Sequence, residues 1–180
     1  TGLVTLVQLS AGILGDRNRM SYDAGISYIR NVFEATRTLQ KNPDDLDARG
    51  IIMMGASLST SSRLGIGKEE PFAYEIYELE FLPEKLFGSS YRRSLTSVFP
   101  RFLQAMGKHH ADDIRKFYHD AFGFDSSIEE SSRKLVELFE GLGVEMYYDG
   151  KITREQVDAI PCHTELSKEE VFDIINSLIR

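Results

Sequence analysis

Residues 42–67 read NPDDLDARGIIMMGASLSTSSRLGIG and contain the signals for both ends of a helix. Asn42 and Pro43 end any helix that precedes them, and acidic residues follow at the expected start of the next helix. Small and apolar side chains then recur until Gly65-Ile66-Gly67, a typical helix stop. We predict a helix from about Asp45 to Leu64.

The same three- and four-residue spacing of apolar side chains recurs on both sides of this stretch. It predicts helices over residues 3–13, 71–82, 91–106, 111–122 and 127–142, and one capped by Ser21 over 24–39. The capping boxes Thr153-x-x-Gln156 and Ser167-x-x-Glu170 open two more. Pro100 is expected to kink or restart its helix.

Strand signals are confined to residues 144–148, and residues 83–90 resemble a polar connection. The fold class predicted is therefore all-α, a bundle-like arrangement of about eight helices. We expect a single domain over residues 1–180, with residues 152–180 as short appended helices.

The composition excludes several classes of protein. The net charge of −7 argues against nucleic acid and anionic membranes as partners. The single cysteine, Cys162, rules out an internal disulfide and favours the cytoplasm, and no apolar run is long enough to span a bilayer. A chain that starts at Thr1 is what a segment of a longer protein looks like.

Three segments together resemble one family. They are NPDDLDAR (42–49) with its LGIG stop (64–67), YRRSLTSVFP (91–100), and the closing helix that begins LSKEEV (166–171). In order and spacing they are similar to the C-terminal helical domain of iron-containing alcohol dehydrogenases, a dehydroquinate synthase-like fold. The resemblance covers nearly all of the chain.

The resemblance implies NAD(P)-linked interconversion of alcohols and aldehydes, with iron or zinc as the metal. It also implies a partner, an N-terminal α/β nucleotide-binding domain, that this chain lacks. The family's ligand and active-site positions fall on Thr5, Leu9, Glu75, Leu79 and Tyr91. A transition metal in such a site needs imidazoles and a carboxylate. No histidine precedes His109, so we predict that the metal site is lost and that this chain binds no cofactor and has no catalytic residue.

If the helices keep the family arrangement, Thr5, Leu9, Glu75, Leu79 and Tyr91 should converge. Leu9 and Leu79 would fill the space of the metal with apolar contacts. Glu75 would need a partner, because an unpaired buried carboxylate is costly. Tyr91 or Arg92 is the nearest candidate in the sequence.

Five other motifs have a functional and a structural interpretation. Gly65-Ile66-Gly67-Lys68 could touch phosphate, but it ends a helix, and anions bind at helix starts. His109-His110 point different ways on a helix. Cys162-His163 lacks the signals of a nucleophile. Arg92-Arg93 could bind an anion, and Glu75 and Glu78 could be an acid–base pair. For each we favour the structural interpretation: a helix cap, a helix start, a loop, an ion-paired patch and an acidic face.

Two hypotheses of different classes remain open. In the first, the chain comes from an oxidoreductase of this family and is inactive alone, as a pseudoenzyme would be. In the second, it is a non-catalytic helical domain for assembly or partner binding. Homo-oligomerisation is compatible with either.

Overall fold

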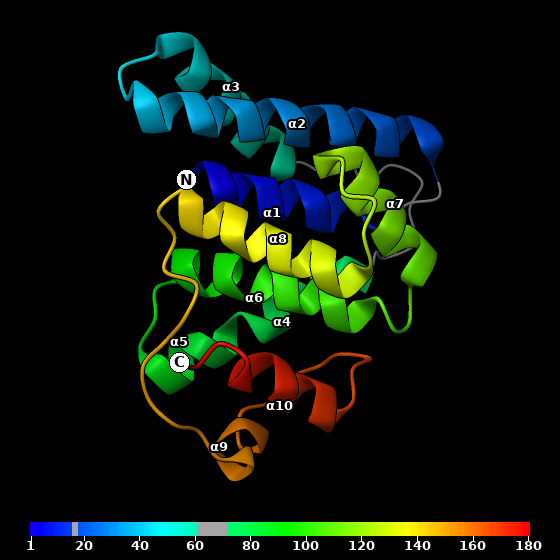
Figure 1. The fold of residues 1–180 in the computed structure, drawn as a ribbon, viewed down its shortest axis with the longest axis vertical. Coiled ribbons are helices and arrows are strands. Elements are labelled where there is room, and N and C mark those ends of the chain that lie inside the picture. The colour runs from blue at the N-terminus through cyan, green and yellow to red at the C-terminus, as the bar shows by residue number, and fades with distance from the viewer. Residues whose placement is uncertain (16–17, 61–71) are drawn as a thin grey trace. The chain divides into compact units, whose positions relative to one another are not determined.

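A computed structural model describes residues 1–15, 18–60 and 72–180 of the chain (Figure 1). In these residues the structure is helical, and the sole strand-like feature is an isolated parallel bridge between Tyr148 and Ile179. The all-α prediction is thus confirmed, whereas residues 144–148 contribute one bridge residue and no strand. None of the described helices is long and apolar enough to cross a membrane.

The helices have the following bounds: α1 Gly2–Ile13, α2 Arg19–Lys41, α3 Leu46–Ser59, the 3-10 helix η2 Phe72–Glu75, α4 Ile76–Leu79, α5 Phe81–Phe87, α6 Tyr91–Met106, α7 Ala111–Phe122, α8 Ile128–Gly141, α9 Arg154–Asp158 and α10 Lys168–Asn176. The chain divides into two compact units. The first unit comprises residues 1–74 and 116–124, and the second comprises residues 75–115 and 125–180. Both α9 and α10 belong to the second unit.

The first unit is built on α1, which packs against α2 and α3. Helix α1 is apolar on nearly all sides, and its buried residues include Leu6, Val7 and Leu9. A helix with this composition is stable only when other helices cover it on most sides. Helix α2 has one buried face, which includes Ile29 and Val32, and an exposed polar face.

The C-terminal half of α7 belongs to the first unit and carries aromatic side chains to α2. The rings of Phe33 and Phe122 meet edge to face with centroids 6.0 Å apart. Beside them the Tyr22 hydroxyl donates to Asp120 Oδ2 at 3.0 Å, and Arg30 Nε donates to the Asp120 carbonyl at 2.6 Å. Aromatic packing and charged hydrogen bonds therefore fix this turn of α7 to α2.

The second unit is built around α6, with α4, α5, α8 and α10 packed on it (Figure 1). Phe99, Phe102 and Leu103 of α6 are fully buried. Ser132 of α8 donates from Oγ to the Pro100 carbonyl at 2.6 Å. Helix α6 is thus the common packing surface of the unit.

Among the described residues, the predicted helix starts hold except one. Both capping boxes are present, at Thr153–Gln156 and Ser167–Glu170, and Ser127 caps α8. Ser21 is not a cap, because α2 begins two residues before it. Asn18 caps α2 instead, with Oδ1 accepting from the backbone N of Met20 and Ser21. Asn and Ser are equally good caps, so the sequence pattern alone could not choose between them.

Two prolines behave differently from the predictions. Residues 83–90 are not simply a connection, since α5 runs from Phe81 to Phe87. Pro83 is its third residue, where the backbone N–H would have no partner within the helix. Pro100 does not restart its helix, as α6 is continuous from Tyr91 to Met106. The predicted end of the third helix, residues 61–67, and the predicted start at Pro71 lie outside the described residues.

Gly55 and Gly50 of α3 provide a matched test of packing in the first unit. A Cβ on Gly55 would lie 2.5 Å from Val32 Cγ2, a stiff and buried side chain, whereas a Cβ on Gly50 would meet nothing within 4 Å. We expect Gly55→Ala to lower the free energy of unfolding by about 1–3 kcal/mol, because overpacking strains a core. Gly50→Ala should raise it by about 0.5–1 kcal/mol, because alanine favours a helix. Urea unfolding of both variants measures these changes, and equal effects would contradict this description of the α2–α3 contact.

Candidate functional site

Two of the five positions that the family resemblance assigns to the site lie in the first unit. Thr5 and Leu9 are buried and one turn apart on α1. A Cβ on Gly55 would lie 3.2 Å from Thr5 Cγ2 and 3.8 Å from Leu9 Cδ1, so both side chains face α3 with their methyl groups. Their role in this unit is to pack α1 against α3.

The other three positions lie in the second unit. Glu75 ends η2 and is half-buried, Leu79 ends α4 and is fully buried, and Tyr91 begins α6 with 38% of its surface exposed. Because the five positions are divided between the two units, the convergence predicted for them stays a prediction.

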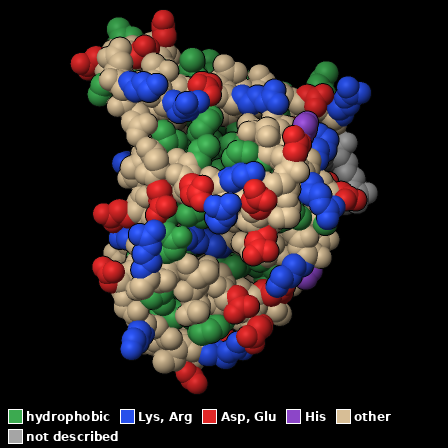
Figure 2. Space-filling view, in the orientation of Figure 1, with side chains coloured by type: hydrophobic (Ala, Val, Ile, Leu, Met, Phe, Trp, Pro, Cys, Tyr) green, Lys and Arg blue, Asp and Glu red, His purple; other side chains and the backbone are tan. Residues whose placement is uncertain are grey.

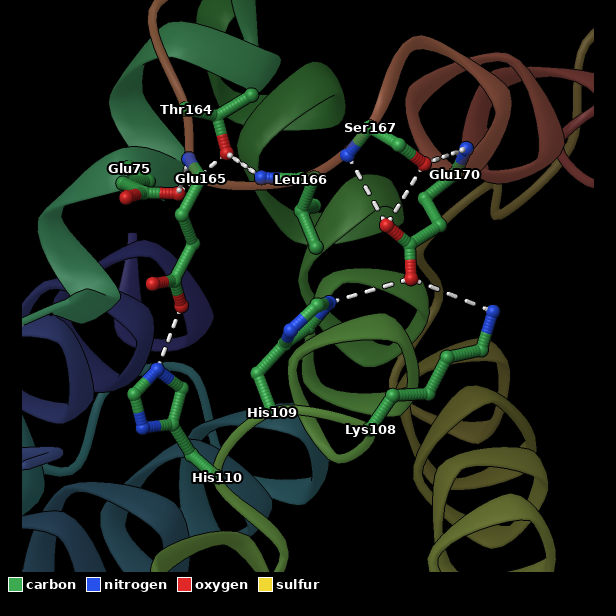
Figure 3. A network of polar contacts seen from close by, with 9 residues as sticks. All are labelled: Glu75, Lys108, His109, His110, Thr164, Glu165, Leu166, Ser167 and Glu170. Atoms are coloured by element: carbon green, nitrogen blue, oxygen red, sulfur yellow. Dashed lines mark hydrogen bonds and ion pairs between the residues drawn. The ribbon is translucent and has the colours of Figure 1, made fainter.

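Glu75 is paired, as predicted, but with partners far away in the sequence. Its Oε2 accepts hydrogen bonds from the Thr164 hydroxyl and from the Glu165 backbone N, the latter at 3.1 Å (Figure 3). These partners differ from the candidates nearest in the sequence, Tyr91 and Arg92. One helical turn later, Glu78 Oε2 accepts from the His163 backbone N at 3.2 Å. The two carboxylates therefore hold the segment between α9 and α10 and do not form an acid–base pair with each other.

The same segment is held from its other side by the turn between α6 and α7 (Figure 3). His110 Nε2 lies 2.5 Å from Glu165 Oε1, and His109 Nε2 lies 3.2 Å from Glu170 Oε1. Lys108 Nζ is 3.5 Å from that same Glu170 oxygen. Each histidine has its own carboxylate, consistent with the prediction that adjacent histidines do not chelate. They are more than a solvated helix start, because they link α6 to the start of α10.

Glu170 has a second role as a helix cap. Its Oε2 accepts from the backbone N of Ser167 at 3.0 Å and from the Ser167 hydroxyl at 2.8 Å. The backbone hydrogen bond, followed by those from the Ser167 hydroxyl and His109, outweighs burial and lowers the pKa of Glu170 to about 2. Glu170 is therefore a fixed negative charge under the Lys108–His109 turn.

Cys162 is a poor candidate nucleophile. Burial, and then the charges of Glu78 and Glu75, raise the pKa of its thiol to about 11. The thiolate is the reactive form of cysteine, and reactive cysteines lie in electropositive surroundings. Cys162 lies in electronegative surroundings and stays a thiol.

Arg93 is occupied by structural contacts. Its Nη1 is 3.1 Å from Glu145 Oε2, its Nε donates to the Glu145 carbonyl at 3.2 Å, and its Nη2 donates to the Tyr147 carbonyl. The guanidinium also lies 4.2 Å from the centroid of the Tyr148 ring. The predicted ion-paired patch is thus present at Arg93, whereas Arg92 is exposed.

Glu80 is a buried carboxyl group that the sequence analysis did not single out. The residue is only 3% exposed, and its Oε2 is buried without a hydrogen-bond partner. Burial, then the charge of Glu84 and a hydrogen bond with it, raise the pKa of Glu80 to about 8. The spacing in the sequence does indicate that Glu80 is buried. Glu80 lies four residues after the apolar Ile76 and three before Pro83, and residues three or four apart share a helix face.

No described part of the chain brings three or more His, Cys, Asp or Glu side chains together in a way that could hold a metal ion. The glycine pair at Gly65 and Gly67, weighed as a phosphate contact, lies outside the described residues. The contacts found at Glu75, Glu78 and Glu170 are all within the protein.

The fold is similar to that of NADH-dependent butanol dehydrogenase A from Thermotoga maritima, with a TM-score of 0.82 and 16% sequence identity; the match covers 99% of this chain and 51% of that one. Maleylacetate reductase from Agrobacterium tumefaciens gives a TM-score of 0.70 at 15% identity, again with 99% and 51% covered. The chain has the fold of half of these enzymes. This agrees with the fold predicted from the family resemblance. No family model and no curated protein matches the sequence.

The raised pKa of Glu80 predicts how stability depends on pH. The folded carboxyl keeps its proton up to about pH 8, whereas an unfolded carboxyl loses it near the ordinary value of 4.5. Between these values the folded state binds more protons, so its stability falls as pH rises. We expect Glu80→Gln, a neutral side chain of similar shape, to reduce this fall.

Urea unfolding at about pH 5 and pH 8 tests this expectation. Glu34→Gln is the control, because Glu34 is a 66% exposed carboxylate whose ion pair with Arg37 contributes little. The assignment is wrong if Glu80→Gln and the wild type lose the same free energy between the two pH values.

Cys162 should react slowly with a thiol reagent in the native protein, because a pKa of about 11 leaves little thiolate near pH 8. Glu78→Gln should speed the reaction by removing one of the two charges that oppose ionisation. Unfolding in urea gives the reference rate of an ordinary cysteine. A native rate equal to the unfolded rate would show that the thiol is neither buried nor perturbed.

Proposed function

We propose that this chain is the helical domain of an oxidoreductase of the iron-containing alcohol dehydrogenase type, and that the metal site of that family is lost in it. The likeness of fold to a butanol dehydrogenase supports the lineage. Folds host many functions, so the proposal about activity rests on the side chains.

The donor set at the family positions carries the proposal. Leu9 and Leu79 have no donor atom and are fully buried. Thr5 is packed by its methyl group, and the Glu75 carboxylate already accepts two hydrogen bonds. One carboxylate without an imidazole does not fit iron or zinc, which are bound by three or four N, S or O ligands. No step of alcohol chemistry is therefore assigned to this chain.

The proposed partner is an N-terminal α/β nucleotide-binding domain that would bind NAD(P). The chain spans 51% of the length of the butanol dehydrogenase and of the maleylacetate reductase. On this proposal the chain alone is inactive, as a pseudoenzyme domain located in the cytoplasm.

The alternative function is a non-catalytic helical domain that binds a partner protein or a second copy of itself. One observation favours it, the apolar face of α3. Leu46, Met53 and Met54 are 78%, 73% and 64% exposed. Contiguous exposed apolar residues are typical of interaction surfaces.

Elemental analysis tests the loss of the metal site. After dialysis against iron and zinc salts and then buffer, we expect far less than one metal ion per chain. A stoichiometric metal that disappears in Glu75→Ala would refute the proposal. As a positive control, Leu9→His combined with Glu75→His and Tyr91→His restores imidazoles, and zinc binding by this variant would support the predicted convergence of the family positions.

The same preparations are then tested for NADH binding and for oxidation of butanol. We expect neither from the chain alone. Turnover by the wild-type chain would overturn both the pseudoenzyme proposal and the assignment of cofactor binding to a separate domain.

A further inference from the structure

A groove of about 630 Å³ lies on the second unit, between α6 and α8. Arg101 and Gln104 of α6, Ser132 and Val136 of α8, and Tyr147 from the segment after α8 line it. This volume is in the range of small-molecule sites. The lining combines apolar and polar groups from elements that are well packed on one another.

The carboxylates along the groove are largely paired with cations. Helix α8 carries side chains of both signs over its outer face (Figure 2). The ion pairs are Glu130–Lys134 at 3.0 Å, Glu137–Arg133 at 2.5 Å and Glu140–Arg180 at 3.0 Å. Glu129 is the one acidic lining residue without such a pair among the described residues. These ion pairs therefore neutralise most of the negative charge along the groove.

Arg101 is the exception among the cations. It is only 8% exposed, yet it forms no ion pair with any described residue. Its Nη1 donates to the Ser97 carbonyl at 3.0 Å, and its guanidinium lies 4.9 Å from the centroid of the Tyr147 ring. Glu140, the carboxylate whose charge acts on it, is already bonded to Arg180.

Arg101 lines the groove, and none of its other nitrogens is among the buried polar atoms that lack a partner. Each of them therefore either reaches the groove or has a polar partner, of which Tyr147 is one. A desolvated guanidinium without an ion-pair partner is costly, and burial, opposed by the weaker effects of Tyr147 and Glu140, lowers the pKa of Arg101. A bound anion would remove this cost.

We propose that the groove is an anion-binding site in which Arg101 binds a carboxylate or phosphate group of a small ligand. The planar guanidinium offers parallel N–H donors that match both groups. Tyr147 supports the guanidinium from one side and is itself covered by Arg180, whose Cζ is 3.9 Å from the ring centroid. None of the family positions lines the groove, so the proposal does not depend on the alcohol dehydrogenase lineage.

Titration with inorganic phosphate and, separately, with succinate tests the site, against sodium chloride at matched ionic strength. The readout is the NMR resonance of Arg Nε–Hε groups and of backbone amides around residues 97–104 and 132–136. We expect saturable shifts with at least one of the two anions and none with chloride. The anion that binds more tightly indicates whether the site prefers a phosphate or a carboxylate group. Shifts that are linear in concentration, or equal to those with chloride, would overturn the proposal.

Arg101→Gln and Arg115→Gln are the matched variants, since Arg115 is an exposed arginine that is paired with Asp112 and does not line the groove. We expect Arg101→Gln to weaken binding by about tenfold or more, and Arg115→Gln to leave it within about twofold. If Arg101→Gln does not fold, Arg101→Lys replaces it as the test variant. It keeps the positive charge but loses the parallel N–H donors of the guanidinium, and it should still weaken binding several-fold. Unchanged affinity in the folded Arg101 variant would refute the assignment.

Discussion

Within the second unit, the position of the segment between α9 and α10 depends on the hydrogen bonds from residues 164–165 to the Glu75 carboxylate. They join η2 to a segment about 90 residues later in the chain. That segment then places Glu165 beside His110 and Glu170 beside His109. A single acceptor thus ties η2 to the segment that carries Glu165, while the start of α10 is set by its own capping box. The family resemblance would give a metal ligand at the same position, but here the carboxylate serves as a structural acceptor.

How well each feature could be predicted depends on the sequence distance of the contacts that form it. The boxes at Thr153 and Ser167 are bonds between residues three apart, so the sequence contains both partners and the prediction held. The choice of Asn18 over Ser21 depends on where tertiary packing begins α2. The partners of Glu75 and the burial of Glu80 are decided by elements far apart in sequence, and local patterns do not specify these. The metal-site positions come from the family resemblance, and the prediction that their side chains do not hold a metal stays a prediction.

The likeness of fold to a butanol dehydrogenase and a maleylacetate reductase is compatible with the proposed loss of the metal site, because a fold and a metal site depend on different residues. The fold follows from apolar spacing, as in α6, where Phe99 and Phe102 are fully buried. Such patterns tolerate wide sequence change, which is consistent with a TM-score of 0.82 at 16% identity. A metal site needs particular atoms at particular positions. Replacing His by Leu at a buried helix position removes the ligand while strengthening the core.

Glu80 has a thermodynamic consequence beyond its effect on the pH profile. At neutral pH the folded chain holds a proton on this carboxyl, whose pKa is raised to about 8, and the unfolded chain does not. Unfolding is therefore accompanied by proton release to the solvent. The released proton is taken up by the buffer, so the heat of unfolding includes the buffer's own heat of protonation. Calorimetric enthalpies of this protein will differ between phosphate and Tris, although the protein unfolds to the same state in both.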